Sequence, residues 1–369
     1  MGTTVGLEQT SLAENMMHSV VAASQSAAAS VEIGLSAAIV SVRDDEPIVL
    51  VVDDQHDGAS HIGASGSHYQ GQKDPRKDAL PSGSFAPERH HTLDAALRDW
   101  VEHQTSVDLG YVEQLYTFAD RGRGRSTGSA DPHVVSVSYL ALTRTSPTNG
   151  STANPQGARW CSWYDYFPWE DWRRGKPVGL LHDIEARLRL WCDREPLTDS
   201  KPNMPDRRAR CLMAFGFENG SWDEERVLER YELLYEAGLV AEAKTDGCEA
   251  ADSWETPMLF GRAMHHDHRR ILATAISRMR GKIKYRPVVF ELMPPEFTLF
   301  ELQKTVEAIL GPHLHKQNFR RLVEGAGLVQ PTSEVRAKTG GRPAKLFRFR
   351  HEVFLERPAP GVRVKPSRS

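Results

Sequence analysis

The N-terminal third of the chain combines two kinds of hydrophobic pattern. Residues 31–42 and 46–52 are apolar, strand-like runs separated by a polar Arg-Asp-Asp-Glu turn, and further strand-like runs cover 111–119 and 133–144. Between these pairs, residues 92–103 repeat apolar side chains at helical spacing behind Thr92, which is a suitable N-cap. Strands mixed with a helix in this order predict a layered α/β domain.

The central part of the chain has a different pattern. A Ser-, Asn- and Gly-containing joint at 146–158 leads into an aromatic segment, 162–177, which contains five Trp and Tyr residues. Helical periodicity follows at 184–191, 207–215 and 224–240, and Gly238 is positioned to end the last helix. We therefore expect an aromatic-rich helical middle region.

From residue 265 onwards the pattern predicts a winged helix-turn-helix. A helix at 268–283 and a short strand at 286–292 precede a helix at 297–310, which opens with Thr298 and Glu301 in capping-box spacing. Gly311-Pro312 turns the chain into a second helix at 315–328, and a basic hairpin with its tip at Gly340-Gly341 covers 328–350. This succession is the order of a winged helix.

The second helix of this motif carries chemistry suited to DNA. Phe319, Leu322 and Val323 form an inward stripe, while its N-terminal half is polar and basic. In the major groove, Arg can bind guanine and Asn or Gln adenine, and Lys neutralises phosphate. The alternative is a basic, solvated helix on an ordinary helical subdomain. The predicted DNA contacts are Lys316, Gln317, Asn318, Arg320, Arg321 and, on the wing, Arg342 and Lys345.

Charge along the chain supports a polyanion partner. The net charge is −3, but residues 262–369 contain 22 Lys and Arg and 9 Asp and Glu, giving that segment +13. The preceding 261 residues therefore carry −16. A basic C-terminal segment on an acidic body favours a polyanion that binds the C-terminal segment.

The cysteine spacing, the N-terminal segment and the length of the apolar runs indicate the cellular compartment of the protein. The four cysteines form no CxxC pair, which argues against structural zinc and a secreted disulfide framework and favours the reducing cytosol. The Ala- and Ser-rich start lacks a basic n-region, so we expect a mobile tail instead of a signal peptide. No apolar run has membrane-spanning length, so we expect no membrane partner.

The helix at 92–103 resembles an incomplete Nudix signature, G-x5-E-x7-R-E-U-x-E-E-x-G-U. Arg98 and Glu102 match the pattern, and Trp100 occupies a bulky position. Asp99 replaces the Glu that follows the Arg, His103 replaces the second Glu of the later pair, and Thr105 replaces the closing Gly. Gly83 can serve as the opening Gly, but it lies one residue too far from Arg98. Arg89 or His90 occupies the position of the first Glu. Magnesium prefers clustered oxygen ligands, so we interpret the box as a decayed catalytic site. An unrelated amphipathic helix is the alternative reading of the box alone.

The wider chain resembles Nudix-related transcriptional regulators of the NrtR type. The resemblance rests on the strand–loop–strand at 111–142 after the box, and on DHRRIL, FTLFELQ, NFRRLVE and GRPAKLFRF. It covers roughly 31–145 and 265–350, and the added middle region is similar to that of the NadQ regulators of NAD biosynthesis in alphaproteobacteria. The resemblance implies a homodimeric repressor of NAD biosynthesis genes that binds a palindromic operator, requires no cofactor and senses NAD, ADP-ribose or ATP.

The residues suggest a pocket for such an effector. Arg121 and Arg123, in a Gly-rich loop, are candidate phosphate contacts, and Trp163 or Tyr166 could stack on adenine. The alternatives are a solvated loop and a packing patch of aromatic residues. Two further functions stay open: a Nudix hydrolase with a DNA-binding tail, and metal sensing through His265, His266 and His268 or through His313 and His315.

Together, these observations predict a Nudix-like αβα sandwich followed by a helical middle region and a C-terminal winged helix-turn-helix. We expect a disordered tail at 1–30, the effector domain at 31–158, and the middle region at 159–262. The DNA-binding domain is expected at 263–355, followed by a tail at 356–369.

Overall fold

The computed structural model describes residues 31–53, 78–119, 133–144, 157–194, 205–218, 220–256, 258–336, 343–356 and 361–362. The expected N-terminal tail, most of the expected C-terminal tail and residues 54–77 lie outside these ranges, as do Arg121, Arg123 and the predicted wing residue Arg342. Within the described residues, every helix is too short or too polar to cross a lipid bilayer.

A seven-stranded mixed sheet forms the N-terminal domain. Its main path runs β3-β2-β1-β6-β5, with β4 paired to β1 and β7 paired to β2. Strands β1 and β6 are parallel, and the other pairs are antiparallel. The strands are β1 (Val31–Arg43), β2 (Glu46–Asp53), β3 (Asp78–Ala79), β4 (Ser82–Ser84), β5 (Tyr111–Phe118), β6 (His133–Leu142) and β7 (Arg159–Ser162).

Alternation along β1 divides the core between the two faces of the sheet. Leu35, Ala37 and Ile39 pack with helix α2 (Leu93–Thr105), whereas Ala38 and Val40 belong to the larger core on the opposite face. Because successive strand side chains point to opposite faces, one strand supplies both cores. The helix begins as predicted, since the Thr92 side chain accepts a hydrogen bond from the Ala95 amide.

The middle region is helical, as expected. After the short helices α3 (Trp163–Tyr166) and η3 (Pro168–Glu170) come α4 (Val178–Asp193), α5 (Arg207–Phe215), α6 (Val227–Glu236), α7 (Ala241–Thr245) and α8 (Glu249–Asp252). Gly238 follows α6 with φ +71°, and a Cβ at this residue would lie 2.4 Å from the Ala251 backbone. Glycine is therefore required here both by conformation and by space.

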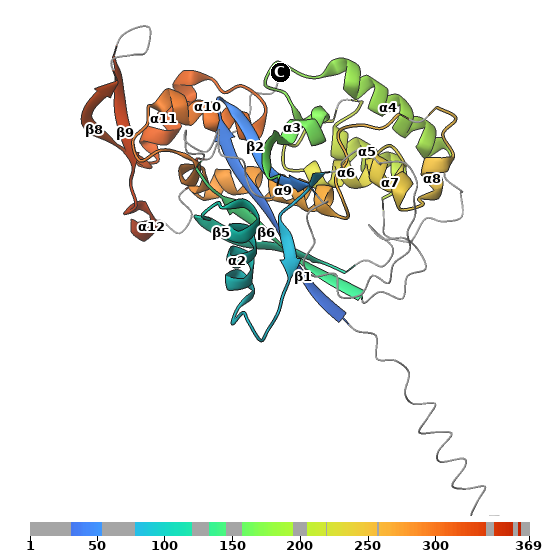
Figure 1. The fold of residues 1–369 in the computed structure, drawn as a ribbon. Coiled ribbons are helices and arrows are strands. Elements are labelled where there is room, and N and C mark those ends of the chain that lie inside the picture. Colours follow the sequence, from blue (N-terminus) through green and yellow to red (C-terminus); the bar gives the residue numbers. More distant parts are fainter. Residues whose placement is uncertain are drawn as a thin grey trace, which may run out of the picture.

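Helix α9 (His268–Tyr285) connects all parts of the fold. It contacts β1, β5 and β6 on the sheet, α6 of the middle region, and α10 (Leu299–Leu310). Figure 1 shows α9 near the centre of the molecule, with the helices of the middle region on one side and the C-terminal elements on the other. Helices therefore cover both faces of the sheet, as the sandwich prediction requires.

The C-terminal elements follow the predicted order with one correction. Helix α10 leads to α11 (Lys316–Gly325), the hairpin β8 (Val329–Arg336) and β9 (Ala344–Phe349), and α12 (Val353–Glu356). The strand predicted at 286–292 is wrong, because Val288–Leu292 forms a 3-10 helix, η4. Val288, Val289, Phe290 and Leu292 are all buried, and a short, fully buried apolar run gives no periodicity that separates a strand from a helical turn. With this exception, the predicted fold class is confirmed.

Candidate nucleic-acid interface

The candidate interface begins with the sharp turn between α10 and α11. The predicted capping box is present: Thr298 accepts from the Glu301 amide, and Glu301 accepts from the Thr298 amide. At the other end of α10, one carboxylate oxygen of Glu307 accepts hydrogen bonds from Gln303 (2.8 Å) and from the Leu314 amide (3.0 Å). Burial raises the pKa of Glu307, but these hydrogen bonds lower it more, and the net pKa lies below the ordinary value. A charged Glu307 thus fixes the turn that orients α11.

Helix α11 has one buried apolar face and one exposed polar face. Phe319 (2% exposed) and Val323 (fully buried) anchor the inner face. All five predicted contacts on this helix lie on the exposed side: Lys316, Gln317, Asn318, Arg320 and Arg321. Their roles stay predictions, but the structure brings them together on one accessible surface beside the wing.

The wing contributes a second exposed basic surface. Lys345 is exposed on β9, as is Arg348, which the sequence reasoning did not select. On β8, Arg336 is engaged in an ion pair with Glu301 of α10, and Phe297 exchanges backbone hydrogen bonds with Phe347. These contacts attach the wing to the start of α10. The available sequence signal for Arg348 was its position between Phe347 and Phe349 in the predicted hairpin.

The sequence analysis also did not include two exposed features at the ends of α11 in the candidate interface. His315 occupies the N-cap position and is exposed, although its side chain makes no capping hydrogen bond. Near the other end, Arg320 Nε lies 3.2 Å from a carboxylate oxygen of Glu324. The spacing of four residues along a helix is the available sequence signal for this ion pair.

The Nudix-like box forms an exposed polar surface on α2. Asp99, Glu102 and His103 are exposed and lie opposite the buried Leu97, as the periodicity predicted. His90 Nε2 lies 3.2 Å from one Asp99 oxygen, and His103 Nδ1 lies 3.4 Å from the other. In the part of the chain that the structure describes, no group of three or more His, Cys, Asp or Glu side chains is arranged to hold a metal ion.

Two other box residues have structural contacts. Arg98 donates to Asp94 (3.0 Å) and to the Leu109 carbonyl (2.6 Å), which joins the helix to the following loop. The Trp100 indole donates to the Ser84 carbonyl, and its ring lies so close to Gly83 that a Cβ there would approach within 2.3 Å. The glycine that matches the opening of the signature therefore serves helix–strand packing.

The predicted stacking of an effector on Trp163 or Tyr166 is wrong for this structure. Both side chains are fully buried, and the Tyr166 hydroxyl donates to the buried carboxylate of Asp78 at 2.5 Å. Neither ring presents a face to a ligand, so both belong to the packing patch that was the alternative. The phosphate contacts Arg121 and Arg123 lie outside the described residues and stay predictions.

The histidines of the metal-sensing alternative have other partners. His268 is buried at the start of α9, and its Nδ1 accepts a hydrogen bond from the Leu80 amide at 3.0 Å. Burial, with His266 and His265 nearby, lowers its pKa well below the ordinary value. His313 Nδ1 lies 3.2 Å from Glu307. Asp267 occupies the N-cap position of α9 without a side-chain capping hydrogen bond.

A buried charge network connects the middle region to α10. Glu170 pairs with Arg230 (2.5 Å) and Arg280 (2.6 Å), and all three side chains are at most 1% exposed. Arg280 also donates to the Ile309 carbonyl, and the Tyr164 hydroxyl donates to the Ala308 carbonyl, both at 2.8 Å. Donors from two other elements therefore hold the C-terminal carbonyls of α10, immediately before the turn into α11.

Comparison with known proteins identifies the C-terminal domain. Residues 289–349 match the NrtR DNA-binding winged helix domain. Over 83 residues, the chain is 43% identical to the "ADPR responsive transcriptional repressor NtrR" of Acinetobacter baylyi; the match covers 22% of this chain and 33% of that protein. The matched part thus spans about a third of the curated relative's length. The match begins at residue 289, after the end of α9. The DNA-binding domain expected from the sequence began at residue 263 and therefore included α9.

Two solved structures are similar to this chain at low sequence identity. Shewanella oneidensis NrtR, crystallised with a 27mer DNA, is 19% identical, with a TM-score of 0.48 over 87% of this chain and 94% of its own. A MutT/nudix family protein from Enterococcus faecalis is 14% identical, with a TM-score of 0.46 over 95% of this chain and 100% of its own.

Proposed function

We propose that this chain is a DNA-binding transcriptional repressor whose winged helix docks on duplex DNA. The observation that carries the proposal is the exposed, polar and basic face of α11 beside the exposed Lys345 of the wing. In this motif the second helix enters the major groove, and Arg, Asn and Gln side chains recognise base edges there. The match to the NrtR winged helix domain and the similarity to the Acinetobacter transcriptional repressor NtrR support the same function.

The effector proposed for the Nudix-like domain is a nucleotide, with ADP-ribose first among NAD, ADP-ribose and ATP. The name of the Acinetobacter relative supports this order. We further propose a homodimer on a palindromic operator at genes of NAD biosynthesis, as in NadQ. Arg121 and Arg123 are the proposed phosphate contacts, since a guanidinium can bind phosphate in a bidentate manner.

DNA binding is tested with the full chain and labelled duplexes. We expect affinity that falls steeply with salt, because Lys and Arg release counterions from the phosphates. Genomic fragments from upstream of NAD biosynthesis genes should bind more tightly than a scrambled duplex of equal length. Equal, salt-insensitive binding to all duplexes, or none, would contradict the proposal.

The effector is tested by thermal unfolding with NAD, ADP-ribose and ATP. A ligand that binds the native state raises the melting temperature, and its effect grows with concentration. Arg121→Ala and Arg123→Ala should reduce the shift while leaving the melting temperature without ligand unchanged. A full shift in both variants would place the pocket elsewhere.

The hydrolase alternative is tested by measuring hydrolysis of ADP-ribose and NAD in the presence of Mg²⁺ or Mn²⁺. The carboxylate-poor box of α2 predicts no appreciable turnover. Turnover in the native chain that disappears in Glu102→Gln would establish an enzyme, whereas turnover that persists in the variant would point to a contaminating activity.

A further inference from the structure

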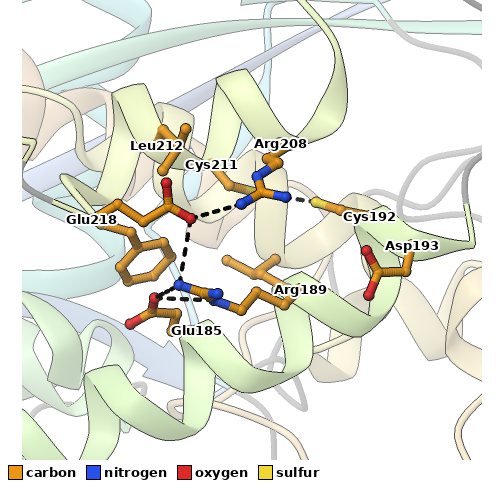
Figure 2. A pocket seen from close by; sticks show the side chains of 10 residues that line it. Glu185, Arg189, Cys192, Asp193, Arg208, Cys211, Leu212 and Glu218 are labelled. Atoms are coloured by element: carbon orange, nitrogen blue, oxygen red, sulfur yellow. Dashed lines mark hydrogen bonds and ion pairs between the residues drawn. The ribbon is translucent and has the colours of Figure 1, made fainter.

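Two cysteine thiols meet in a pocket of the middle region. Cys192, in the last turn of α4, lies with its sulfur 3.8 Å from the sulfur of Cys211 on α5. Leu188, Leu212 and Phe217 form the apolar part of the same pocket, and charged residues form the rest. Figure 2 shows the two cysteines beside the ion-paired side chains of Arg189, Arg208, Glu185 and Glu218.

The two sulfur atoms are in van der Waals contact, 3.8 Å apart. A sulfur–sulfur bond is ~2.05 Å long, so the two atoms need to approach by ~1.8 Å. Cys192 precedes the final residue of its helix, where the last backbone carbonyls have no helical partners and the chain rearranges most easily. Cys211 lies inside α5 and is fixed by packing. A change of side-chain rotamer at the helix end is the smallest movement that closes the gap.

The two thiols differ in accessibility. Cys192 is partly exposed, whereas Cys211 is 4% exposed and burial raises the pKa of its thiol. The guanidinium of Arg208 lines the same pocket and pairs with Glu218 at 2.9 Å. Cys192 is therefore suited to react first, and Cys211 is placed to react second.

We propose that Cys192 and Cys211 form a reversible disulfide by exchange with a small-molecule disulfide that enters this pocket. The Cys192 thiolate attacks one sulfur of the reagent, which forms a mixed disulfide and releases one thiolate. Cys211 then loses its proton to solvent and attacks the Cys192 sulfur, which releases the second thiolate. The two cysteines lose two electrons and two protons in total, and the reagent is reduced to two thiols.

The bond would join the end of α4 to α5 across the intervening segment. A cross-link between residues separated in sequence restricts the unfolded chain and so favours the folded state. We expect the oxidised protein to melt several degrees above the reduced form, and excess reduced thiol to reverse the shift.

The experiment uses the full chain equilibrated with glutathione disulfide and reduced glutathione, and quenched with a maleimide. Wild type should lose two alkylatable thiols, and peptide mapping should find a Cys192–Cys211 link. Cys211→Ser should instead retain one glutathione on Cys192, because the mixed disulfide has no second thiol to displace it. Cys192→Ser should form neither product.

Cys248→Ser is the matched control, because Cys248 is also partly exposed but lies outside the pocket. It should behave like wild type. The proposal is overturned if wild type stays fully reduced at high glutathione disulfide. It is also overturned if the link involves Cys161 or Cys248, or if Cys211→Ser captures glutathione while wild type forms no internal bond.

Discussion

At the scale of single residues, we expect α11 to recognise bases and the wing to bind phosphate, and the two roles can be tested separately. Asn318, Arg320 and Lys345 are exposed, so their removal should not change the free energy of unfolding. We expect Asn318→Ala or Arg320→Ala to weaken operator binding by about 1–3 kcal/mol and to relax base preference. Lys345→Ala should weaken all duplexes alike and reduce the salt slope by about one unit.

Binding isotherms on the operator and on a scrambled duplex, each at several salt concentrations, distinguish these outcomes. Equal losses on both duplexes for Asn318→Ala would mean that this side chain does not recognise bases. An urea titration of each variant checks that the fold is unchanged.

Glu324 restrains one of the predicted base-reading residues. Its carboxylate pairs with Arg320, but both side chains are exposed (42% and 62%), and exposed pairs contribute only about 0.2–1 kcal/mol. Glu324→Gln should free Arg320 and remove a negative charge from the interface, tightening DNA binding by about two- to fivefold. Glu229→Gln, an exposed carboxylate on α6, is the matched control and should have no effect. Equal tightening in both variants would indicate net charge alone.

His268 gives the unfolding free energy a predictable pH dependence. Its pKa is lowered in the folded state, so below about pH 6.5 the unfolded chain binds a proton that the folded chain does not. The unfolding free energy should therefore fall as pH decreases below that value, by at most about 1.4 kcal/mol per pH unit for this group. The contribution of His268 to the unfolding free energy should be fully retained above about pH 6.5.

Urea titrations between about pH 7.5 and 5.5 measure this slope. His268→Gln should flatten it, whereas His182→Gln, at an exposed position of α4, should leave it unchanged. The same slope in wild type and His268→Gln would show that other groups are responsible.

At the scale of elements, the network of Glu170, Arg230 and Arg280 holds the middle region, α9 and α10 together. Glu170→Gln leaves two fully buried guanidinium groups without their carboxylate, and loss of one partner in a buried pair costs about 3–5 kcal/mol. We expect the free energy of unfolding to fall by about that amount. Glu185→Gln, which removes one partner of the exposed Arg189, should lower the free energy of unfolding far less, because solvent screens exposed pairs. Comparable losses in the two variants would contradict a special role for the buried network.

At the scale of the whole molecule, the +13 charge of residues 262–369 and the acidic remainder favour DNA binding through one end of the protein. We expect a dimer in solution by light scattering, with the two α11 helices entering major grooves about one helical turn, or a multiple, apart. Inserting about half a turn, roughly five base pairs, between the half-sites should abolish two-site binding. Undiminished binding to that duplex would argue for independent monomers.

The sequence by itself determined the elements whose signals are local. The apolar run of β1, the Thr92 cap, the Thr298–Glu301 capping box and the amphipathic face of α11 all depend on neighbours within a few residues, and each is present in the structure. The order of these elements was then enough to predict a layered α/β domain, a helical region and a winged helix.

Only the tertiary structure decided what depends on contacts between distant segments. Burial placed Trp163 and Tyr166 in the core, although their sequence spacing is equally compatible with a stacking platform. Long-range packing made α9 a shared element of three parts, and turned 288–292 from the expected strand into a 3-10 helix. It also brought Cys192 and Cys211 together across a segment with no pairing motif. Such contacts join residues tens of positions apart, and a local pattern does not specify them, because many folds bury the same apolar residues.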